Sequence, residues 1–267
     1  SGSTDGTWES ILRYNQQVDR IIRIRPEDDV PGRVLNLMVA MCREPIVILL
    51  SAEAIPADSE WIEKLIQPLL VDEADVSVSQ QLPRPGTSFI VRMDYERWTR
   101  GGSVPPNYAA ACAFKRSLWL ETKFAVDGFS DELAWAYSCR KKGYRFRLAR
   151  GSLVEHSRKE SLSQVYQRGR KEGEADVYLH RDGLQLTRTC LDGLAIMVSD
   201  FLHAMRKGYL WTLPYNVSYR CAYYHGYCKG RFKAMKTQVG GVLDKGSKTS
   251  LKLEREGVAQ IDNQRSE

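Results

Sequence analysis

A continuous apolar run at residues 46–50 constrains the fold of this chain more than any other stretch. The run reads IVILL, and the polar tip Ser51-Ala52-Glu53 follows it directly. Aliphatic residues without polar alternation are typical of a strand that is buried on both faces of a parallel sheet. The run therefore predicts an α/β fold in which helices cover both sides of such a sheet.

Helix and strand patterns alternate around this run. Helical apolar spacing predicts helices over 30–44 and 59–72, and the segments 18–28 and 74–83 are predicted as strands. The segment 84–107 is rich in Gly, Pro and aromatic residues and is predicted as an irregular loop. A strand and a short helix are expected over 108–123, and a helix that stops at Gly143, followed by two strands, over 130–157.

The chain is expected to divide into three parts. Residues 1–160 form the expected α/β catalytic domain, and 161–240 form a C-terminal helical region with helices near 162–180, 183–207 and 215–235. Residues 241–267 are polar and are expected to be a disordered tail.

Charge and composition limit the classes of partner. The formal net charge is +6, and the excess lies in the C-terminal half, which favours an anionic partner such as a nucleotide or a lipid surface. No motif typical of nucleic-acid-binding proteins is present, so a nucleic-acid partner is not expected. No apolar run reaches the roughly 18 residues of a membrane span.

Glu53 is the first candidate for a functional side chain. Ligands of open α/β sheets bind where strands end, and Glu53 follows the apolar run at such an end. Its carboxylate is the type of ligand that Mg²⁺ and Mn²⁺ prefer. The alternative is a solvated turn residue.

Two further patterns carry candidate groups. Asp131 and Glu132 begin a predicted helix, where a carboxylate can act as a general base or can simply interact with the helix dipole. His156 follows a strand-like segment, where its imidazole can ligate a metal, contact phosphate or make an ordinary loop hydrogen bond.

The order of these pieces resembles glycosyltransferase family 2. The pieces are SGSTDGT at the start, SAEAIPADSEWIEKLIQPL, DELAWAYSCRKKGYRF and GSLVEHS. The resemblance covers residues 1–171 and, more loosely, the helices to about residue 235. The resemblance is greatest to bacterial rhamnosyltransferases and to O-antigen or capsule glycosyltransferases. It implies a GT-A (Rossmann-like) α/β fold with a mixed sheet flanked by helices, a nucleotide-sugar donor and direct inversion at the anomeric carbon.

The resemblance also implies roles for individual residues. Glu132 falls at the position of the family's catalytic base, directly after Asp131. Glu53 and His156 would bind Mg²⁺ or Mn²⁺, and Arg33 and Asp5 would contact the donor. The expected acceptor is a hydroxyl of a growing cell-surface polysaccharide or of a lipid-linked glycan, on the cytoplasmic side of the membrane.

Several departures from the family pattern leave alternatives open. The usual two-acid metal motif is reduced to Glu53, and the usual Glu-Asp pair is inverted at Asp131-Glu132. The family's first strand is expected to be missing before Ser1, so weak nucleotide binding is expected. A non-catalytic scaffold protein with the same fold is therefore the alternative to an enzyme.

The basic helical region also has two readings. The segment 191–211 is amphipathic and ends near Tyr209, Trp211 and Tyr215. Such a helix can lie in a membrane interface, or it can pack on the catalytic domain with its charged face in water. The sequence therefore predicts peripheral membrane contact as one of two equal possibilities.

Overall fold

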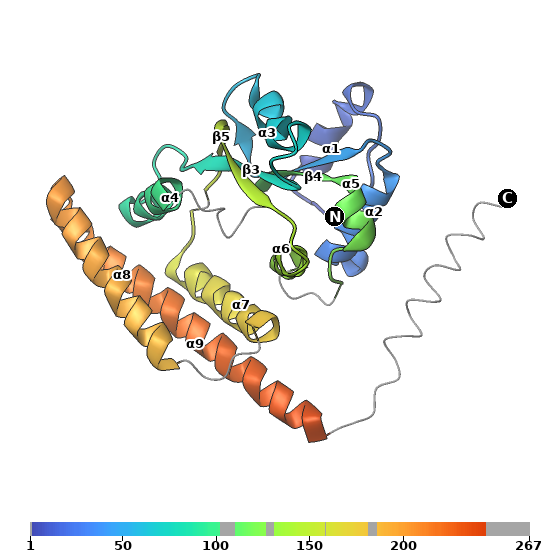
Figure 1. Cartoon of the computed structure of the whole chain (residues 1–267). Coiled ribbons are helices and arrows are strands. Elements are labelled where there is room, and N and C mark those ends of the chain that lie inside the picture. Colours follow the sequence, from blue (N-terminus) through green and yellow to red (C-terminus); the bar gives the residue numbers. More distant parts are fainter. Residues whose placement is uncertain (1, 102–109, 127–130, 158, 181–185, 244–267) are drawn as a thin grey trace.

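The computed structural model describes residues 2–101, 110–126, 131–157, 159–180 and 186–243 (Figure 1). Within them, one sheet contains β1 (Ile46–Leu50), β2 (Ile55–Pro56), β3 (Val76–Leu82), β4 (Ala111–Lys115) and β5 (Phe146–Glu155). The strand order is β1-β4-β3-β5-β2. Because β4 is antiparallel to β1 and β3, and β3 is parallel to β5, the strands β1, β3 and β5 all point the same way. The predicted mixed α/β sheet is confirmed.

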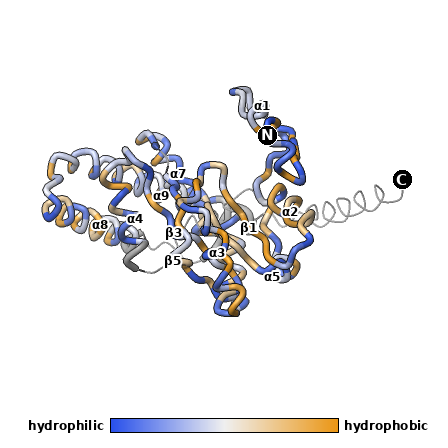
Figure 2. Tube along the Cα trace, turned by 90° about the horizontal axis from the view of Figure 1, so that it is seen from above, coloured by the Kyte–Doolittle hydropathy of each residue, from blue (hydrophilic) through white to orange (hydrophobic). Residues whose placement is uncertain are grey.

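Helices cover both faces of this sheet. On one face lies α3 (Trp61–Leu70), and on the other lie α2 (Pro31–Met41), α5 (Arg116–Glu121) and α6 (Asp131–Lys141). Side chains along β3 alternate between these two faces. Val76 and Val78 pack on the face covered by α2, α5 and α6. Ser79 faces α3, where the Trp61 indole Nε1 donates a hydrogen bond of 2.9 Å to its hydroxyl. Hydrophobic stretches accordingly follow the central strands and α3 in Figure 2.

Short helices precede the sheet. The helix α1 (Thr7–Leu12) and the 3₁₀ turns Asn15–Gln17 and Pro26–Asp28 carry no buried residue. The predicted strand over 18–28 is wrong. Its apolar residues Ile21 and Ile24 are only half-buried, and no described strand pairs with them, so no ladder of hydrogen bonds forms.

The remaining helices form a second body beside the sheet (Figure 1). They are α4 (Phe89–Gly101), α7 (Leu162–His180), α8 (Leu186–Lys207) and α9 (Leu213–Leu243), with a 3₁₀ turn at Leu210–Thr212. Glycines let α7 and α9 approach closely: a Cβ added at Gly173 would lie 2.1 Å from the Tyr227 carbonyl oxygen. A Cβ added at Gly226 would lie 2.1 Å from the Tyr166 carbonyl oxygen, so the close contact is reciprocal.

A buried ionic network joins α4 to α8 and α9. Arg220 donates hydrogen bonds to Asp94 (2.5 and 3.0 Å) and to Asp200 (2.8 Å). Arg97 donates to Asp200 at 2.6 Å. The Arg220 side chain is 6% exposed and that of Asp200 is 4% exposed, so these charges compensate each other away from water.

Three further sequence-based expectations are corrected. The strand at 46–50 exists, but it lies at an edge of the described sheet and pairs antiparallel to β4, so it is not a central strand of a parallel sheet. The expected loop over 84–107 contains α4, because Phe89, Ile90 and Met93 give it a buried face. The two strands expected after Gly143 are one strand, β5, whose register shifts opposite Ser79/Gln80.

The helical region and the end of the chain were also predicted. The helices α7, α8 and α9 occupy the segments that were expected to be helical, and α9 continues to Leu243. Residues 244–267, which include most of the expected tail, lie outside the described residues. Among the helices that the structure describes, none combines the length and the apolar character needed to cross a bilayer.

Candidate active site

The candidate site lies at the end of the sheet that is formed by the carboxyl ends of β1, β3 and β5. Only residues 51–54 connect β1, at one edge of the sheet, with β2, which pairs with β5 at the other. The five Cα–Cα steps from Leu50 to Ile55 span at most about 18 Å, which is less than the roughly 19 Å of four strand spacings. The end of β5 must therefore curl back toward β1, and the connecting loop carries Glu53 across the strand ends.

Glu53 and His156 meet at this edge. The Nε2 atom of His156 lies 3.9 Å from a carboxylate oxygen of Glu53. The imidazole is 9% exposed and the carboxylate is 44% exposed, so the pair has one buried and one open member. The structure thus brings together the two residues that the sequence predicts as metal ligands.

Hydrogen bonds fix the orientation of His156. Its Nδ1 lies 3.2 Å from the Gln81 side-chain oxygen, and its backbone N–H donates to the Leu82 carbonyl at 2.9 Å. The Tyr95 hydroxyl donates to the His156 carbonyl oxygen. In the tautomer in which Nδ1 donates to the Gln81 oxygen, Nε2 would present a lone pair toward Glu53.

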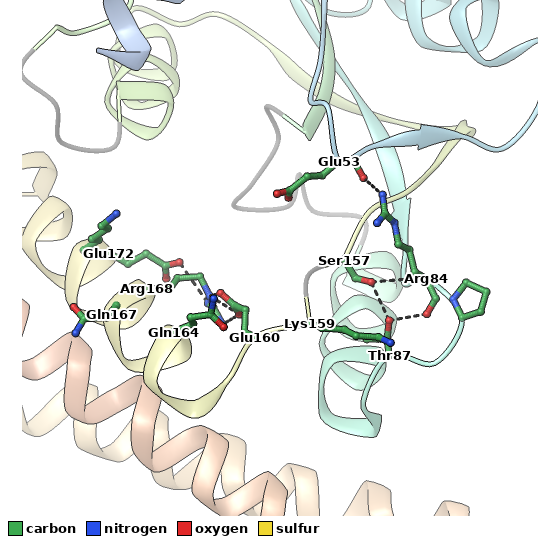
Figure 3. Close-up of a pocket in the computed structure, with 12 residues that line it drawn as sticks. Glu53, Arg84, Thr87, Ser157, Lys159, Glu160, Gln164, Gln167, Arg168 and Glu172 are labelled. Atoms are coloured by element: carbon green, nitrogen blue, oxygen red, sulfur yellow. Dashed lines mark hydrogen bonds and ion pairs between the residues drawn. The ribbon is translucent and has the colours of Figure 1, made fainter. Parts of the chain in front are cut away.

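The loop after β3 is tied to the same edge. The Arg84 backbone N–H donates to the Ser157 hydroxyl at 3.0 Å, and the Thr87 and Ser157 hydroxyls lie 2.9 Å apart. The Arg84 guanidinium donates to the backbone carbonyl oxygen of Glu53 (Figure 3). The loop after β3 therefore holds the backbone of Glu53 and is itself tied to the end of β5 through Ser157.

A cavity of about 880 Å³ opens beside Glu53 (Figure 3). The strand ends form one wall and α7 forms the opposite wall. Its size lies within the range of about 300–1,000 Å³ that is usual for small-molecule sites. Apart from Pro85, the lining residues are all polar or charged. They are Glu53, Arg84, Pro85, Thr87, Ser157, Lys159, Glu160, Gln164, Gln167, Arg168, Lys171 and Glu172.

Charges on the α7 wall are partly paired. Arg168 interacts with Glu160 at 3.1 Å and with Glu172 at 3.5 Å. Burial and the Glu172 carboxylate raise the pKa of Tyr223 well above its ordinary value, so its hydroxyl stays protonated and donates to Glu172 at 2.6 Å. Lys159 and Lys171 also line the cavity, and neither has an ion pair with another described residue.

The predicted base is not part of the cavity lining. Glu132 is exposed in the first turn of α6, and the side chain of Asp131 lies outside the part of the chain that the structure describes. Burial raises the pKa of the Cys112 thiol, and the nearby Glu132 carboxylate raises it further. Glu132 therefore lies near β4, which stands between β1 and β3 in the sheet.

Asp5 and Arg33 are also absent from the cavity lining. Asp5 accepts hydrogen bonds from the Thr7 hydroxyl (2.6 Å) and the Thr7 backbone N–H (3.1 Å), and these bonds lower the pKa of its carboxyl group. They hold the turn that precedes α1, whose N-cap is Gly6 and has no side-chain hydrogen bond. Arg33 is exposed in the first turn of α2.

The sequence analysis missed some residues of the cavity. It did not single out Arg84, Lys159 or Glu160 as site residues, because they come from loops that only the tertiary structure brings together. The available signal was the position of Arg84 and Lys159 just after β3 and β5. Among the described residues, no cluster of three or more His, Cys, Asp or Glu side chains could hold a metal ion by itself.

Residues 1–123 match the family model described as "Glycosyl transferase family 2". This segment ends after α5 and includes Asp5, Arg33 and Glu53, whereas Asp131, Glu132 and His156 lie beyond it. The match covers 123 of the 267 residues, so this part of the chain is similar to family 2 glycosyltransferases. The predicted enzyme class, a glycosyltransferase, is confirmed. No curated protein matches the sequence.

Solved structures support the fold. The chain is similar to the mannosyltransferase PcManGT from Pyrobaculum calidifontis, in complex with GDP-Man and Mn²⁺, at 16% identity and a TM-score of 0.55, over 97% of this chain and 69% of that protein. At this identity the similarity shows the fold, and the predicted GT-A fold is confirmed. Glucosyl-3-phosphoglycerate synthase from Mycobacterium tuberculosis, with Mn²⁺, UDP and phosphoglyceric acid, is 18% identical with a TM-score of 0.46. That resemblance covers 66% of this chain and 64% of the synthase, and it is too weak to add to the argument.

Proposed function

We propose that this chain, whose residues 1–123 match the family 2 glycosyltransferase model, transfers a sugar from a nucleotide-sugar to an acceptor hydroxyl with inversion. The observation that carries the proposal is the pairing of Glu53 with His156, 3.9 Å apart, beside a polar cavity at the strand ends of a GT-A fold. In α/β sheets this edge is where ligands bind.

Glu53 and His156 fit a divalent cation that is shared with the donor. One carboxylate and one imidazole are too few to enclose a metal ion, but Mg²⁺ commonly binds through one or two carboxylates together with substrate phosphates. When bound, Mg²⁺ or Mn²⁺ would neutralise the negative charge of the leaving nucleoside diphosphate. Gln81 keeps the proton on His156 Nδ1, so that Nε2 can act as a ligand.

Glu132 is proposed as the general base. The acceptor oxygen forms the new bond to the anomeric carbon while the bond from that carbon to the diphosphate breaks, and the carboxylate of Glu132 takes the hydroxyl proton. Base catalysis of this kind contributes roughly 10²–10⁴-fold. Asp131 is proposed as the neighbouring acid, and Arg33 and Asp5 as donor contacts on the part of the chain that matches the family.

The cavity offers further positive charge to the donor or acceptor. Lys159 and Lys171 line it without an ion pair to another described residue. They can stabilise a departing diphosphate electrostatically. We propose a cell-surface polysaccharide or a lipid-linked glycan as the acceptor, rhamnose as a candidate sugar, and the cytoplasmic side of the membrane as the location.

Two variants separate the roles of the two acids. Glu53→Gln should abolish Mn²⁺-dependent binding of nucleoside diphosphates, measured by isothermal titration calorimetry, because it removes the charged ligand. Glu132→Gln should retain this binding but lose transfer or hydrolysis of a nucleotide-sugar, measured by release of the diphosphate. Glu63→Gln, an exposed glutamate on α3, is the matched control and should leave both unchanged.

The proposal fails if Glu53→Gln keeps metal-dependent binding at the wild-type affinity. If wild type and Glu132→Gln both bind nucleotide and neither releases diphosphate, the chain is instead a non-catalytic protein with this fold.

A further inference from the structure

The helix α8 presents hydrophobic side chains to the outside of the molecule. Six of them are large and between 39% and 65% exposed: Leu191, Leu194, Val198, Phe201, Leu202 and Met205. At about 100° per residue they fall within an arc of about 100°. We call these six residues the outer face of α8.

The opposite side of α8 is the side that packs on the protein. Gly193, Asp200 and Ala204 are buried there, and Asp200 belongs to the ionic network with Arg220. The helix thus buries a charged side chain and exposes its apolar ones, which reverses the usual pattern of a surface helix. Packing on the catalytic domain therefore does not cover this hydrophobic surface, and α8 lies at the edge of the molecule in Figure 1 and Figure 2.

The chain after α8 extends this surface with aromatic residues. Trp211 is 72% exposed, Leu210 is 48% exposed and Tyr215 is 40% exposed. Arg206 and Lys207 occupy the last turn of α8 and are exposed. Trp and Tyr favour the headgroup level of a membrane, where Lys and Arg meet anionic lipids.

We propose that the outer face of α8, together with Leu210 and Trp211, docks the protein onto an anionic lipid bilayer. The helix would lie in the plane of the interface with its six apolar side chains among the acyl chains. Arg206 and Lys207 would contact the lipid headgroups. Contact of this type needs no membrane-spanning helix and does not depend on the proposed catalytic function.

A second copy of the chain is the main competing occupant. Five of the six residues recur at alternating intervals of three and four, which also fits a helix pair. This pattern covers about two heptads, whereas coiled coils usually sustain it over at least three to four. The face is about 21 Å long and about 10 Å wide, which gives roughly 200 Å². A stable interface buries about 800 Å² on each partner, so the bilayer is the better match.

Vesicle flotation with the full chain tests the proposal. Vesicles of phosphatidylcholine mixed with phosphatidylglycerol should carry the wild-type protein upward, and vesicles of phosphatidylcholine alone should carry much less of it. The double variant Val198→Ser/Phe201→Ser should lower the vesicle partition coefficient by about tenfold or more, because it replaces two apolar side chains of the outer face with small polar ones.

A matched control removes equal apolar surface elsewhere. Ile62 and Leu70 on α3 are 49% and 60% exposed, and Ile62→Ser/Leu70→Ser should float like the wild type. Equal flotation of the α8 variant, or no flotation of the wild type, would overturn the proposal. The proposal would also be overturned if light scattering showed a wild-type dimer that the α8 substitutions dissociate, while neither protein bound to vesicles.

Discussion

The glycine contact between α7 and α9 makes a sharp prediction for Gly173→Ala. A Cβ at this position would lie 2.1 Å from the Tyr227 carbonyl oxygen and 2.8 Å from its carbon. These are backbone atoms, so no side-chain rotation can relieve the overlap. The two helices must move apart by about 1.3 Å to reach an ordinary contact distance of 3.4 Å.

Two opposing effects set the size of the loss. Alanine is better than glycine in a helix interior by about 1 kcal/mol. Overpacking costs about 1–3 kcal/mol, and a backbone overlap of this depth belongs at the upper end. The expected result is a loss of about 2 kcal/mol in the free energy of unfolding, which corresponds to a melting temperature lower by about 4–8 °C.

Thermal unfolding followed by circular dichroism measures this change. Gly193→Ala on α8 is the matched control, because its Cβ would meet only the Tyr224 ring, at 3.4 Å. The control should be neutral or more stable than wild type by up to about 1 kcal/mol. In the double variant Gly173→Ala/Gly226→Ala, the loss of unfolding free energy should be smaller than the sum of the losses in the two single variants, since the first substitution already separates the helices. A Gly173→Ala protein as stable as the control would refute the close packing.

Two acidic residues give the remaining predictions. Burial alone would raise the pKa of Asp75, but hydrogen bonds from Arg145 outweigh it and lower the pKa from 3.8 to about 2. Because the folded-state pKa is the lower one, Asp75 stabilises the fold fully above about pH 4 and loses this effect as the pH falls toward 2. Asp75→Asn should therefore flatten the acid limb of a pH titration of urea-unfolding midpoints, and an unchanged limb would contradict this. Asp200→Asn should lower the free energy of unfolding by about 3 kcal/mol, since it removes a charge partner of the buried Arg220. Asp192→Asn, at an exposed position of α8, is its control. Equal urea-unfolding midpoints for the two variants would exclude the network as a stabilising element.

Local patterns predicted most of the secondary structure but not the pairing of its strands. The run at 46–50 is a strand, yet its partner β4 comes some 60 residues later along the chain and runs antiparallel to it. A uniform apolar run indicates burial and carries no information on direction. The helix α4 was missed because Gly and Pro residues flank a short apolar pattern whose buried face forms only against α7, α8 and α9.

The positions of Glu53 and His156 directly after predicted strands indicated, from the sequence alone, that both belong to the site. Glu53 and His156 each follow a strand, and β1 and β5 point the same way, so their ends meet at one edge. The α7 wall could not be predicted in this way, because helix periodicity does not say which loop faces the helix. For α8 the sequence predicted an amphipathic helix but left its orientation open. The structure shows that Asp200 is buried and that Val198 and Phe201 are exposed, and the proposed membrane docking rests on this orientation.

The helix α7 links the stability of the helical region to the shape of the site. Arg168 and Lys171 line the cavity, while Gly169 and Gly173 on the same helix contact the backbone of α9. Because these contacts leave no room for a side chain, α7 cannot slide along α9 without overlap, and the cavity wall keeps its position. The matched family segment, residues 1–123, supplies Glu53 and the strand ends, whereas this wall comes from residues beyond it. Substitutions on α7 can therefore reshape this wall of the cavity while Glu53 and His156 stay in place.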